Sequence, residues 1–316
     1  MKSIRVHAFG GIDAMIHEDV PVPAPGPGQV LVRVAAAGVG PWDAWVRAGK
    51  SVLPQPLPLT LGADFSGTVE VAGSGVDAIR PGLAVYGATN PRFTGAYADY
   101  ALAEATMIAP KPGLLTDAEA GSVAVVACTA HQMLFEDARV EPGNTVAVLG
   151  GGGNVGSYAV QLAVLAGAQV IATGRRNDLE RIRALGAAAV VPADEPPPPE
   201  LASRADLVVD TVGGGVLDQA FDWLRPGGTL LSAVAEPDRV RAARHGSEAR
   251  FILVKVTTDR LRHLASLFDT GRLKAKIGRE FKLSEARLAH RLMEAGAPAG
   301  KIVLLPDPPK PAGQVE

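Results

Sequence analysis

Cysteine is almost absent from this sequence: Cys128 is the only one among 316 residues. A single thiol cannot form a disulfide within the chain, and it cannot supply the cysteine pairs of a structural zinc site. We therefore predict a cytoplasmic protein in which Cys128 is a buried packing residue. Any metal would have to be bound by His, Asp or Glu, and the six histidines are scattered without an H-x-x-x-H cluster.

An excess of either charge is also lacking. Thirty-one Lys and Arg residues are balanced by 33 Asp and Glu residues, which gives a formal net charge of −2. This balance argues against nucleic acid and against an anionic membrane as partners. The hydrophobic fraction of 47% and the charged fraction of 20% are typical of a globular protein. The length suggests about two domains.

Charged residues are missing altogether between Pro142 and Gly174. A run of this length could be a membrane-spanning helix. The four glycines at positions 150–153 interrupt it, however, and a lipid-exposed helix would leave backbone groups unsatisfied there. We therefore predict a buried strand, a turn, a helix and a second strand, with no membrane association.

The chain changes character near residue 115. Before it, β-branched runs such as residues 29–35 and 68–71 alternate with glycine and proline, which indicates a small β-rich domain. After it, apolar strands alternate with helices, which predicts an α/β fold with a doubly wound parallel sheet. The predicted strands are residues 145–149, 170–173, 189–191, 206–210 and 229–233. The predicted helices include 155–165, 259–269 and 285–295, and a helical stretch is predicted within 115–134.

A glycine-rich motif of the form G-x-G-x-x-G follows the strand at 145–149 and opens the helix at 155–165. A motif in this position indicates a dinucleotide site, because glycines let the backbone approach a pyrophosphate at the N-terminus of the helix. We predict that a dinucleotide binds the residues Gly151, Gly152, Gly153, Asn154, Val155 and Gly156.

The end of the second strand indicates which dinucleotide. An NAD site usually has Asp or Glu there, whereas this sequence has Gly174, Arg175 and Arg176. Two guanidinium groups favour a 2′-phosphate, so we predict NADPH, bound by these three residues. The alternative is that both arginines are solvated charges at the start of a helix.

Several short segments are specific as a set, because of their order and spacing along the chain. They are residues 37–43 (AGVGPWD), 61–67 (LGADFSG), 95–100 (GAYADY), 210–214 (DTVGG) and 300–304 (GKIVL). Together they resemble the medium-chain dehydrogenase/reductase superfamily, in its zinc-independent quinone oxidoreductase branch, which includes zeta-crystallin. The resemblance implies a GroES-like catalytic domain at 1–121, a Rossmann NADP-binding domain at 122–255, a return to the first domain at 256–316, and a homodimer.

The resemblance also bears on zinc. The zinc alcohol dehydrogenases of this superfamily carry a cysteine ligand after the early strand and a His-Glu pair after a glycine. Residues 38–40 (GVG) and 62–64 (GAD) stand at those places here. We therefore predict that the chain binds no metal.

Zinc-free relatives often carry an Asn and a Tyr beside the nicotinamide, where this chain has Gly40 and Trp45. We predict that Trp45 offers a stacking surface for an aromatic acceptor. Asp43 matches the pattern of the relatives, and it either belongs to the site or holds Arg47 or the neighbouring turn. Thr129 either approaches the nicotinamide or packs within its helix. The resemblance further implies cofactor contacts from Gly40, Pro41, Thr129, Val212 and Gly213.

Without a Lewis acid, hydride transfer suits acceptors that are already electrophilic. We therefore predict an NADPH-dependent, zinc-independent oxidoreductase that reduces quinones or activated α,β-unsaturated carbonyl compounds. Two alternatives remain open: an enoyl-thioester or alkenal reductase on the same scaffold, and a catalytically weak NADPH-binding structural protein. The second alternative arises because the chain lacks both the Asn and the Tyr.

Overall fold

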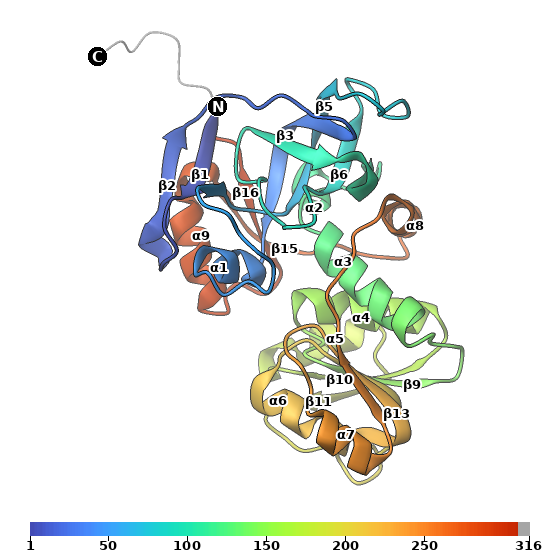
Figure 1. Cartoon of the computed structure of the whole chain (residues 1–316). Coiled ribbons are helices and arrows are strands. Elements are labelled where there is room, and N and C mark those ends of the chain that lie inside the picture. The colour runs from blue at the N-terminus through green and yellow to red at the C-terminus, as the bar shows by residue number, and fades with distance from the viewer. Residues whose placement is uncertain (309–316) are drawn as a thin grey trace. The chain divides into compact units, whose positions relative to one another are not determined.

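The computed structural model describes residues 1–308, and the chain divides into two compact units (Figure 1). Unit 1 contains Met1–Val125, Val256–Asp269 and the residues from Ala275 on, whereas unit 2 contains Val126–Lys255 and Thr270–Lys274. The sequence prediction divides the chain after residues 121 and 255. The end of its last segment, residues 309–316, lies outside the described residues.

Unit 1 is built on a seven-stranded sheet in the order β15-β16-β3-β5-β6-β8, with β7 also paired to β3. A smaller sheet has the order β2-β1-β4. The strands are β1 (Lys2–Val6), β2 (Met15–Asp19), β3 (Gln29–Val39), β4 (Leu59–Thr60), β5 (Asp64–Ala72), β6 (Ala84–Ala88), β7 (Tyr100–Glu104), β8 (Ile108–Pro110), β15 (Ile277–Lys282) and β16 (Lys301–Leu305).

The last strand of unit 1, β16, pairs with β3 near the start of the chain. The pairing is antiparallel, with Ile302 opposite Val39 and Leu304 opposite Ala37. This register brings Lys301 to the end of β3, where Gly40 follows. The helices of unit 1 are α1 (Pro41–Arg47), α2 (Asp117–Ala120), α8 (Thr258–Asp269) and α9 (Ala286–Glu294), with short 3₁₀ turns η1 (Ile12–Ala14), η2 (Ala105–Met107) and η6 (Leu283–Glu285).

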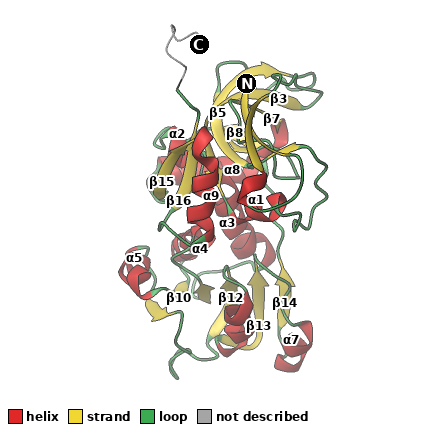
Figure 2. Cartoon of the chain, turned by 90° about the vertical axis from the view of Figure 1, so that its left-hand side faces the viewer, coloured by secondary structure: helices red, strands yellow, loops and turns green. Residues whose placement is uncertain are grey.

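Unit 2 contains a six-stranded parallel sheet in the order β11-β10-β9-β12-β13-β14. This order is that of the doubly wound Rossmann fold, so the predicted fold class is confirmed. The strands, yellow in Figure 2, are β9 (Thr145–Leu149), β10 (Gln169–Gly174), β11 (Ala189–Pro192), β12 (Ala205–Asp210), β13 (Leu224–Ser232) and β14 (Glu248–Phe251).

The helices of unit 2 pack beside this sheet. Helix α4 (Asn154–Leu165) contacts β9, β10 and β12, and it begins directly after the glycine turn. The other helices are α5 (Leu179–Ala184), α6 (Gly214–Asp218) and α7 (Arg239–His245), with 3₁₀ turns η4 (Arg176–Asp178) and η5 (Gln219–Asp222). No helix among residues 1–308 is long and apolar enough to cross a membrane.

The helical stretch predicted within residues 115–134 is divided in the structure. Helix α2 is followed by α3 (Ala124–His131), and α3 continues as a π-helical segment, η3 (Gln132–Asp137). Gly121 interrupts the run because it packs on β3: a Cβ there would lie 2.7 Å from the carbonyl oxygen of Ala36. Cys128 lies in α3 and is fully buried, as predicted.

Candidate active site

The glycine turn of unit 2 joins β9 to α4. A Cβ at Gly156 would lie 2.1 Å from the carbonyl oxygen of Gly150, and a Cβ at Gly151 would lie 2.9 Å from the Cβ of Ala172. Glycine is therefore required for α4 to pack this closely on the strands. Gly153, the N-cap of α4, has no side chain that could accept from the first N–H groups of the helix. A pyrophosphate group fits this end of the helix.

Two polar side chains at strand ends hold the turn and the loop beside it. Thr173, in β10, accepts hydrogen bonds from the N–H of Gly150 at its Oγ1 (3.2 Å) and from the N–H of Gly151 at its carbonyl oxygen (2.8 Å). Asp210, at the end of β12, is fully buried and accepts from the N–H groups of Val212 (3.1 Å) and Gly213 (3.0 Å). The sequence prediction missed both residues, although each stands at the carboxyl end of a parallel strand, where ligands bind in such sheets.

The loop after β12 lies against the glycine turn. A Cβ at Gly150 would come within 2.6 Å of Cγ2 of Val212, whose side chain is exposed. Gly213 has a φ of 78°, a conformation that favours glycine. The structure thus brings together the predicted cofactor residues of the turn and the predicted residues Val212 and Gly213.

Two exposed arginines follow β10. Arg175 follows Gly174 directly and is exposed, at the strand end where the 2′-phosphate is expected. Arg176 forms ion pairs with Asp194 (3.3 Å) and Glu195 (2.7 Å), which raise its pKa. The planar guanidinium of Arg176 therefore already binds two carboxylates of unit 2. The sequence prediction did not anticipate these partners.

An acidic residue also lies next to the glycine turn. Asp178 approaches Gly152 so closely that a Cβ there would lie 3.1 Å from Oδ2 of Asp178. Arg181 donates to Asp178 Oδ1 (2.8 Å) and to the carbonyl oxygen of Gly152 (2.6 Å). The carboxylate is thus neutralised by a neighbouring guanidinium, so the site keeps its capacity for an anionic group.

In unit 1, Asp43 organises the turn that begins α1. Its Oδ2 accepts from the N–H of Gly40 (2.8 Å) and from the hydroxyl of Tyr97 (2.9 Å). Asp43 is fully enclosed, and burial raises the pKa of its carboxyl group to about 7. The side chain therefore holds the neighbouring turn, which is one of the two structural roles considered for it. Among the described residues, no hydrogen bond or ion pair joins Asp43 to Arg47, whose partners are Gly10, His290 and Glu294.

Arg47 instead joins α1 to α9. It donates to Nδ1 of His290 (2.8 Å) and forms an ion pair with Glu294 (2.5 Å). Because Arg can only donate, Nδ1 of His290 must be an unprotonated acceptor. Burial, followed by the charge of Arg47, lowers the pKa of His290 to about 3, so the ring is neutral.

A buried ion pair connects β5 with β16. Lys301 Nζ lies 3.1 Å from Oδ2 of Asp64, and the two side chains are 3% and 0% exposed. Oδ1 of the same carboxylate accepts from the N–H of Val125 (2.7 Å). Lys301 also lies over the ring of Trp42, 4.2 Å from its centroid. No set of three or more His, Cys, Asp or Glu residues in the described part of the chain is grouped to hold a metal.

The residues predicted to be catalytic lie in different settings. Trp45 is on α1 and is 41% exposed, whereas Asp43 is enclosed beneath the same helix. Thr129 is on α3 in unit 2 and is 6% exposed. Three residues of unit 1 were not predicted to belong to the site: Trp42, Asp64 and Lys301. The only sequence signal for them was their position in the AGVGPWD, LGADFSG and GKIVL segments.

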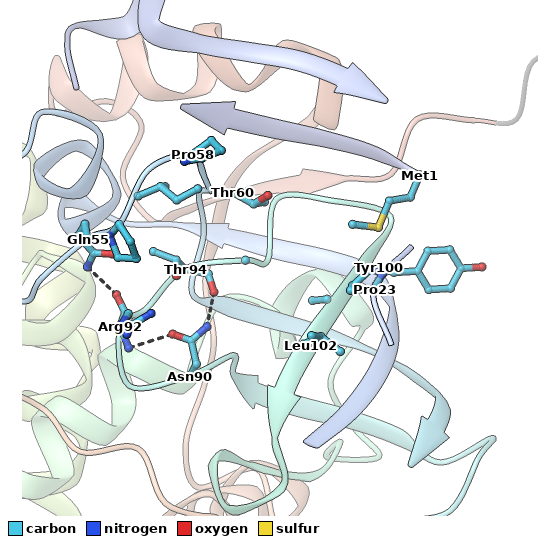
Figure 3. A pocket seen from close by; sticks show the side chains of 14 residues that line it. Met1, Pro23, Gln55, Pro58, Thr60, Asn90, Arg92, Thr94, Tyr100 and Leu102 are labelled. Atoms are coloured by element: carbon cyan, nitrogen blue, oxygen red, sulfur yellow. Dashed lines mark hydrogen bonds between the residues drawn. The ribbon is translucent and has the colours of Figure 1, made fainter. Parts of the chain in front are cut away.

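A cavity of about 290 Å³ lies elsewhere in unit 1 (Figure 3). Two hydrogen bonds hold its wall: Gln55 donates to the carbonyl oxygen of Arg92 (3.0 Å), and Asn90 donates to that of Thr94 (2.6 Å). None of the residues predicted for the site lines this cavity.

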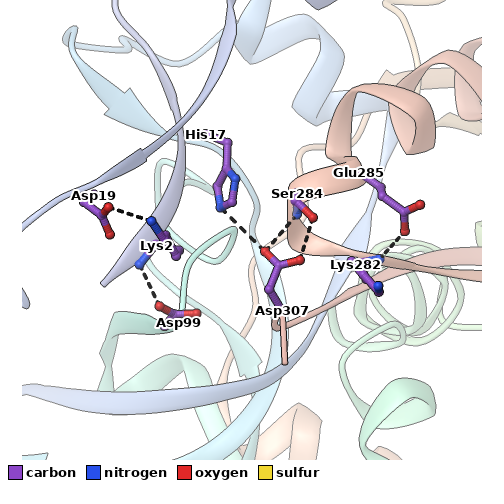
Figure 4. Close-up of polar contacts among 8 residues, drawn as sticks. All are labelled: Lys2, His17, Asp19, Asp99, Lys282, Ser284, Glu285 and Asp307. Carbon is purple, nitrogen blue, oxygen red and sulfur yellow. Dashed lines mark hydrogen bonds and ion pairs between the residues drawn. The ribbon is translucent and has the colours of Figure 1, made fainter. Parts of the chain in front are cut away.

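A second set of polar contacts ties the chain ends of unit 1 together (Figure 4). Asp307 accepts from the hydroxyl of Ser284 (2.5 Å) and lies 3.6 Å from Nε2 of His17. Lys2 forms an ion pair with Asp19 (2.6 Å), and its N–H donates to Asp99 (2.6 Å). These contacts are explained by the packing of terminal strands.

Comparison with known proteins gives consistent matches over both units. The family model described as "Alcohol dehydrogenase GroES-like domain" matches residues 26–113, and the one described as "Zinc-binding dehydrogenase" matches residues 185–304. The chain is 31% identical to the 2-methylene-furan-3-one reductase of Solanum lycopersicum, over 98% of this chain and 80% of the relative. It is 29% identical to the chloroplastic NADPH-dependent alkenal/one oxidoreductase of Arabidopsis thaliana, with the same coverage of 98% and 80%.

A solved structure agrees with these relatives. The quinone oxidoreductase of Coxiella burnetii superposes with a TM-score of 0.85 at 32% identity, over 96% of this chain and 99% of that one. The predicted resemblance, including a GroES-like first domain, is thereby confirmed. The chain belongs to the medium-chain dehydrogenase/reductase superfamily, in its quinone oxidoreductase branch.

Proposed function

We propose that this chain is an NADPH-dependent, zinc-independent oxidoreductase that reduces quinones or activated α,β-unsaturated carbonyl compounds by hydride transfer. The observation that carries the proposal is the glycine turn of unit 2, which Thr173 holds, with the loop held by Asp210 beside it and Arg175 at the neighbouring strand end. Relatives named as quinone, alkenal/one and methylene-furanone reductases support the choice of acceptor.

NADPH, when bound, supplies the hydride. The first N–H groups of α4 bind its pyrophosphate, and Arg175 binds its 2′-phosphate through charge-assisted hydrogen bonds. Arg176 contributes less, because Asp194 and Glu195 already bind its guanidinium. Gly40, Pro41 and Thr129 stay predicted contacts of the nicotinamide, together with Val212 and Gly213. The name of the Arabidopsis relative supports NADPH as the cofactor.

Zinc-independence rests on what occupies the ligand positions. Residues 38–40 offer no side chain that could bind a metal. The carboxylate of Asp64, at the second position, is bound by Lys301 and by the N–H of Val125. A chelator should therefore leave the activity unchanged. Loss of activity on chelation, with recovery on addition of zinc, would contradict this part of the proposal.

An enoyl-thioester or alkenal reductase on the same scaffold is the second candidate, and a relative named as an alkenal/one oxidoreductase favours the alkenals. A catalytically weak NADPH-binding protein is the third, because Gly40 and Trp45 provide neither an amide nor a phenol. A homodimer and a cytoplasmic location belong to the same proposal, and light scattering on the purified chain tests the first of them.

The test is NADPH oxidation by the purified chain with a panel of quinones, alkenals and enoyl thioesters. We expect turnover with quinones or enones, and faster turnover with NADPH than with NADH. If the chain is an enoyl-thioester reductase, kcat/KM should be higher for the thioesters than for the quinones and alkenals. Tight NADPH binding without oxidation by any acceptor would overturn the enzymatic proposal and favour a binding protein.

A further inference from the structure

The indole of Trp42 occupies an unusual place in unit 1. Trp42 lies in the first turn of α1, and its ring folds back onto Gly40. A Cβ at position 40 would lie 2.3 Å from Cζ2, 2.4 Å from Cε2 and 2.5 Å from Cη2 of the ring. Any residue other than glycine at position 40 would therefore displace the indole. The bare backbone at Gly40 and the aromatic ring two residues later form one structural unit.

The face of the ring is held by a buried cation. Lys301 Nζ lies 4.2 Å from the ring centroid and 3.1 Å from Oδ2 of Asp64. Lys301 is 3% exposed, so water screens its charge little, and a desolvated cation–π contact is stronger than an exposed one. The indole thus lies close to both the Gly40 backbone and an ammonium group.

The N–H of this ring has no partner among the described residues. Trp42 Nε1 is buried and makes no hydrogen bond to any described residue. An indole N–H can only donate, and a buried donor without an acceptor costs free energy. Such a group in a folded protein calls for a specific explanation, and a ligand can supply the acceptor that the chain does not.

We propose that Trp42 Nε1–H donates to the carbonyl oxygen of the acceptor that is reduced; this inference rests on the proposed function. When a hydride and its electron pair reach the β-carbon of an enone, the π pair of the C=C bond shifts and negative charge develops on the carbonyl oxygen. A fixed donor, with Lys301 against the same ring, stabilises that charge. Water then supplies the proton that yields the saturated ketone, while NADPH is oxidised to NADP⁺.

A carbonyl oxygen could also come from the carboxamide of the nicotinamide. Trp42→Phe separates the two sources, because it keeps an aromatic ring for Lys301 and removes the N–H together with part of the indole. If the acceptor is the partner, kcat/KM for an enone falls about tenfold or more, mainly through kcat, and the Kd for NADPH stays within about twofold. A weakened Kd for NADPH with unchanged acceptor kinetics would assign the donor to the carboxamide and overturn the proposal.

The same change at the other indole of α1 is the matched comparison. Trp45→Phe also removes one N–H and keeps a ring, but Trp45 is 41% exposed. The proposal requires the larger loss in Trp42→Phe. An equal or larger loss in Trp45→Phe would contradict the assignment to Trp42.

Gly40→Ala supplies a test that does not remove the donor. The new Cβ would displace the indole, so kcat/KM should fall about as far as in Trp42→Phe, about tenfold. In the Trp42→Phe background the fused-ring atoms nearest to position 40 are gone, so the same substitution should cost less than about twofold. If the losses of kcat/KM add in the double variant, Gly40 does not act through the position of the Trp42 indole.

A binding measurement with a ligand that is not reduced tests the role of Trp42 separately from the proposed function. Calorimetry measures the Kd of a saturated cyclic ketone, which cannot be reduced at a C=C bond, for the protein loaded with NADP⁺. We expect about tenfold weaker binding in Trp42→Phe, with thermal unfolding of both proteins monitored as a control. If the wild-type chain turns over no acceptor but this difference is found, the proposed function fails and the binding role of Trp42 stands. If the wild-type chain is active and neither kinetics nor binding changes, the inference is wrong.

Discussion

Burial acts on two residues of unit 1 in opposite directions. The pKa of Asp43 is raised to about 7 by desolvation, against the lowering effect of its hydrogen bonds from Gly40 and Tyr97. The pKa of His290 is lowered to about 3 by desolvation and by Arg47. Between about pH 4 and 7, folded Asp43 keeps a proton that the unfolded chain has lost, so stability falls as pH rises. Folded His290 lacks a proton that the unfolded chain binds below about pH 6.5, so its contribution falls as pH decreases.

Asp43→Asn isolates the first of these effects. The amide does not titrate, and the contribution of His290 is common to both proteins. The free energy of unfolding of the variant minus that of the wild type should therefore increase by a few kcal/mol between about pH 4 and 7, and then level off. Urea denaturation at a series of pH values measures it. A difference that is constant with pH would show that the Asp43 carboxyl titrates normally in the folded chain.

The two arginines after β10 permit a second prediction for single residues. Arg175→Ala should raise the Kd for NADPH about tenfold and leave that for NADH nearly unchanged, since only NADPH carries the 2′-phosphate. Arg176→Ala should have a smaller effect, because its guanidinium is bound by Asp194 and Glu195. Fluorescence titration with both dinucleotides measures the four constants. A larger effect at Arg176, or equal losses for the two dinucleotides, would contradict the assignment.

Among the structural elements, β5 and β16 depend on one buried ion pair. Lys301→Met leaves the carboxylate of Asp64 enclosed without its cation, which should lower the free energy of unfolding by about 3–5 kcal/mol. Adding Asp64→Asn should recover part of this loss, because the amide oxygen can still accept from the N–H of Val125. Urea denaturation of the single and the double variant measures both changes in the free energy of unfolding. A double variant that is less stable than Lys301→Met would refute the explanation by an unpaired charge.

The junction between β9 and α4 depends on glycine at particular positions. Gly156→Ala places a Cβ 2.1 Å from the carbonyl oxygen of Gly150, so the turn cannot keep its shape and NADPH affinity should fall at least about tenfold. Gly153→Ala is the matched substitution: its Cβ would lie 3.2 Å from the same oxygen, at a φ of −78° that alanine adopts readily. Titration with NADPH should show a clearly smaller loss for Gly153→Ala. Equal losses would mean that close packing at Gly156 is not what the motif requires.

Periodicity predicted the elements with strong local signals and missed those that depend on distant contacts. The apolar run at 145–149 is β9 itself. Strand β14 was not predicted, because its sequence, EARF, is only four residues long and contains no β-branched residue. The Lys301–Asp64 pair joins residues 237 positions apart, which no local pattern contains. The same holds for Arg47 and His290, whose contact depends on how α9 packs on α1.

At the scale of the whole molecule, the binding tasks are divided between the two units. Unit 2 carries the glycine turn with Thr173 and Asp210, and unit 1 carries the turn at Gly40 with Trp42 and Lys301. The composition change near residue 115 predicts two domains. It could not predict that residues 270–274 join unit 2, where Lys274 exchanges two hydrogen bonds with the side chain of Gln161.

The most direct test of the account is the fate of the hydride itself. The purified chain should be incubated with C4-deuterated NADPH, of each stereochemistry in turn, and an enone, and the product analysed by mass spectrometry and NMR. We expect that one of the two labelled cofactors transfers deuterium to the β-carbon of the saturated ketone. A reduced product without deuterium from either cofactor, or no reduced product although NADPH binds, would contradict hydride transfer from NADPH to an activated carbonyl compound.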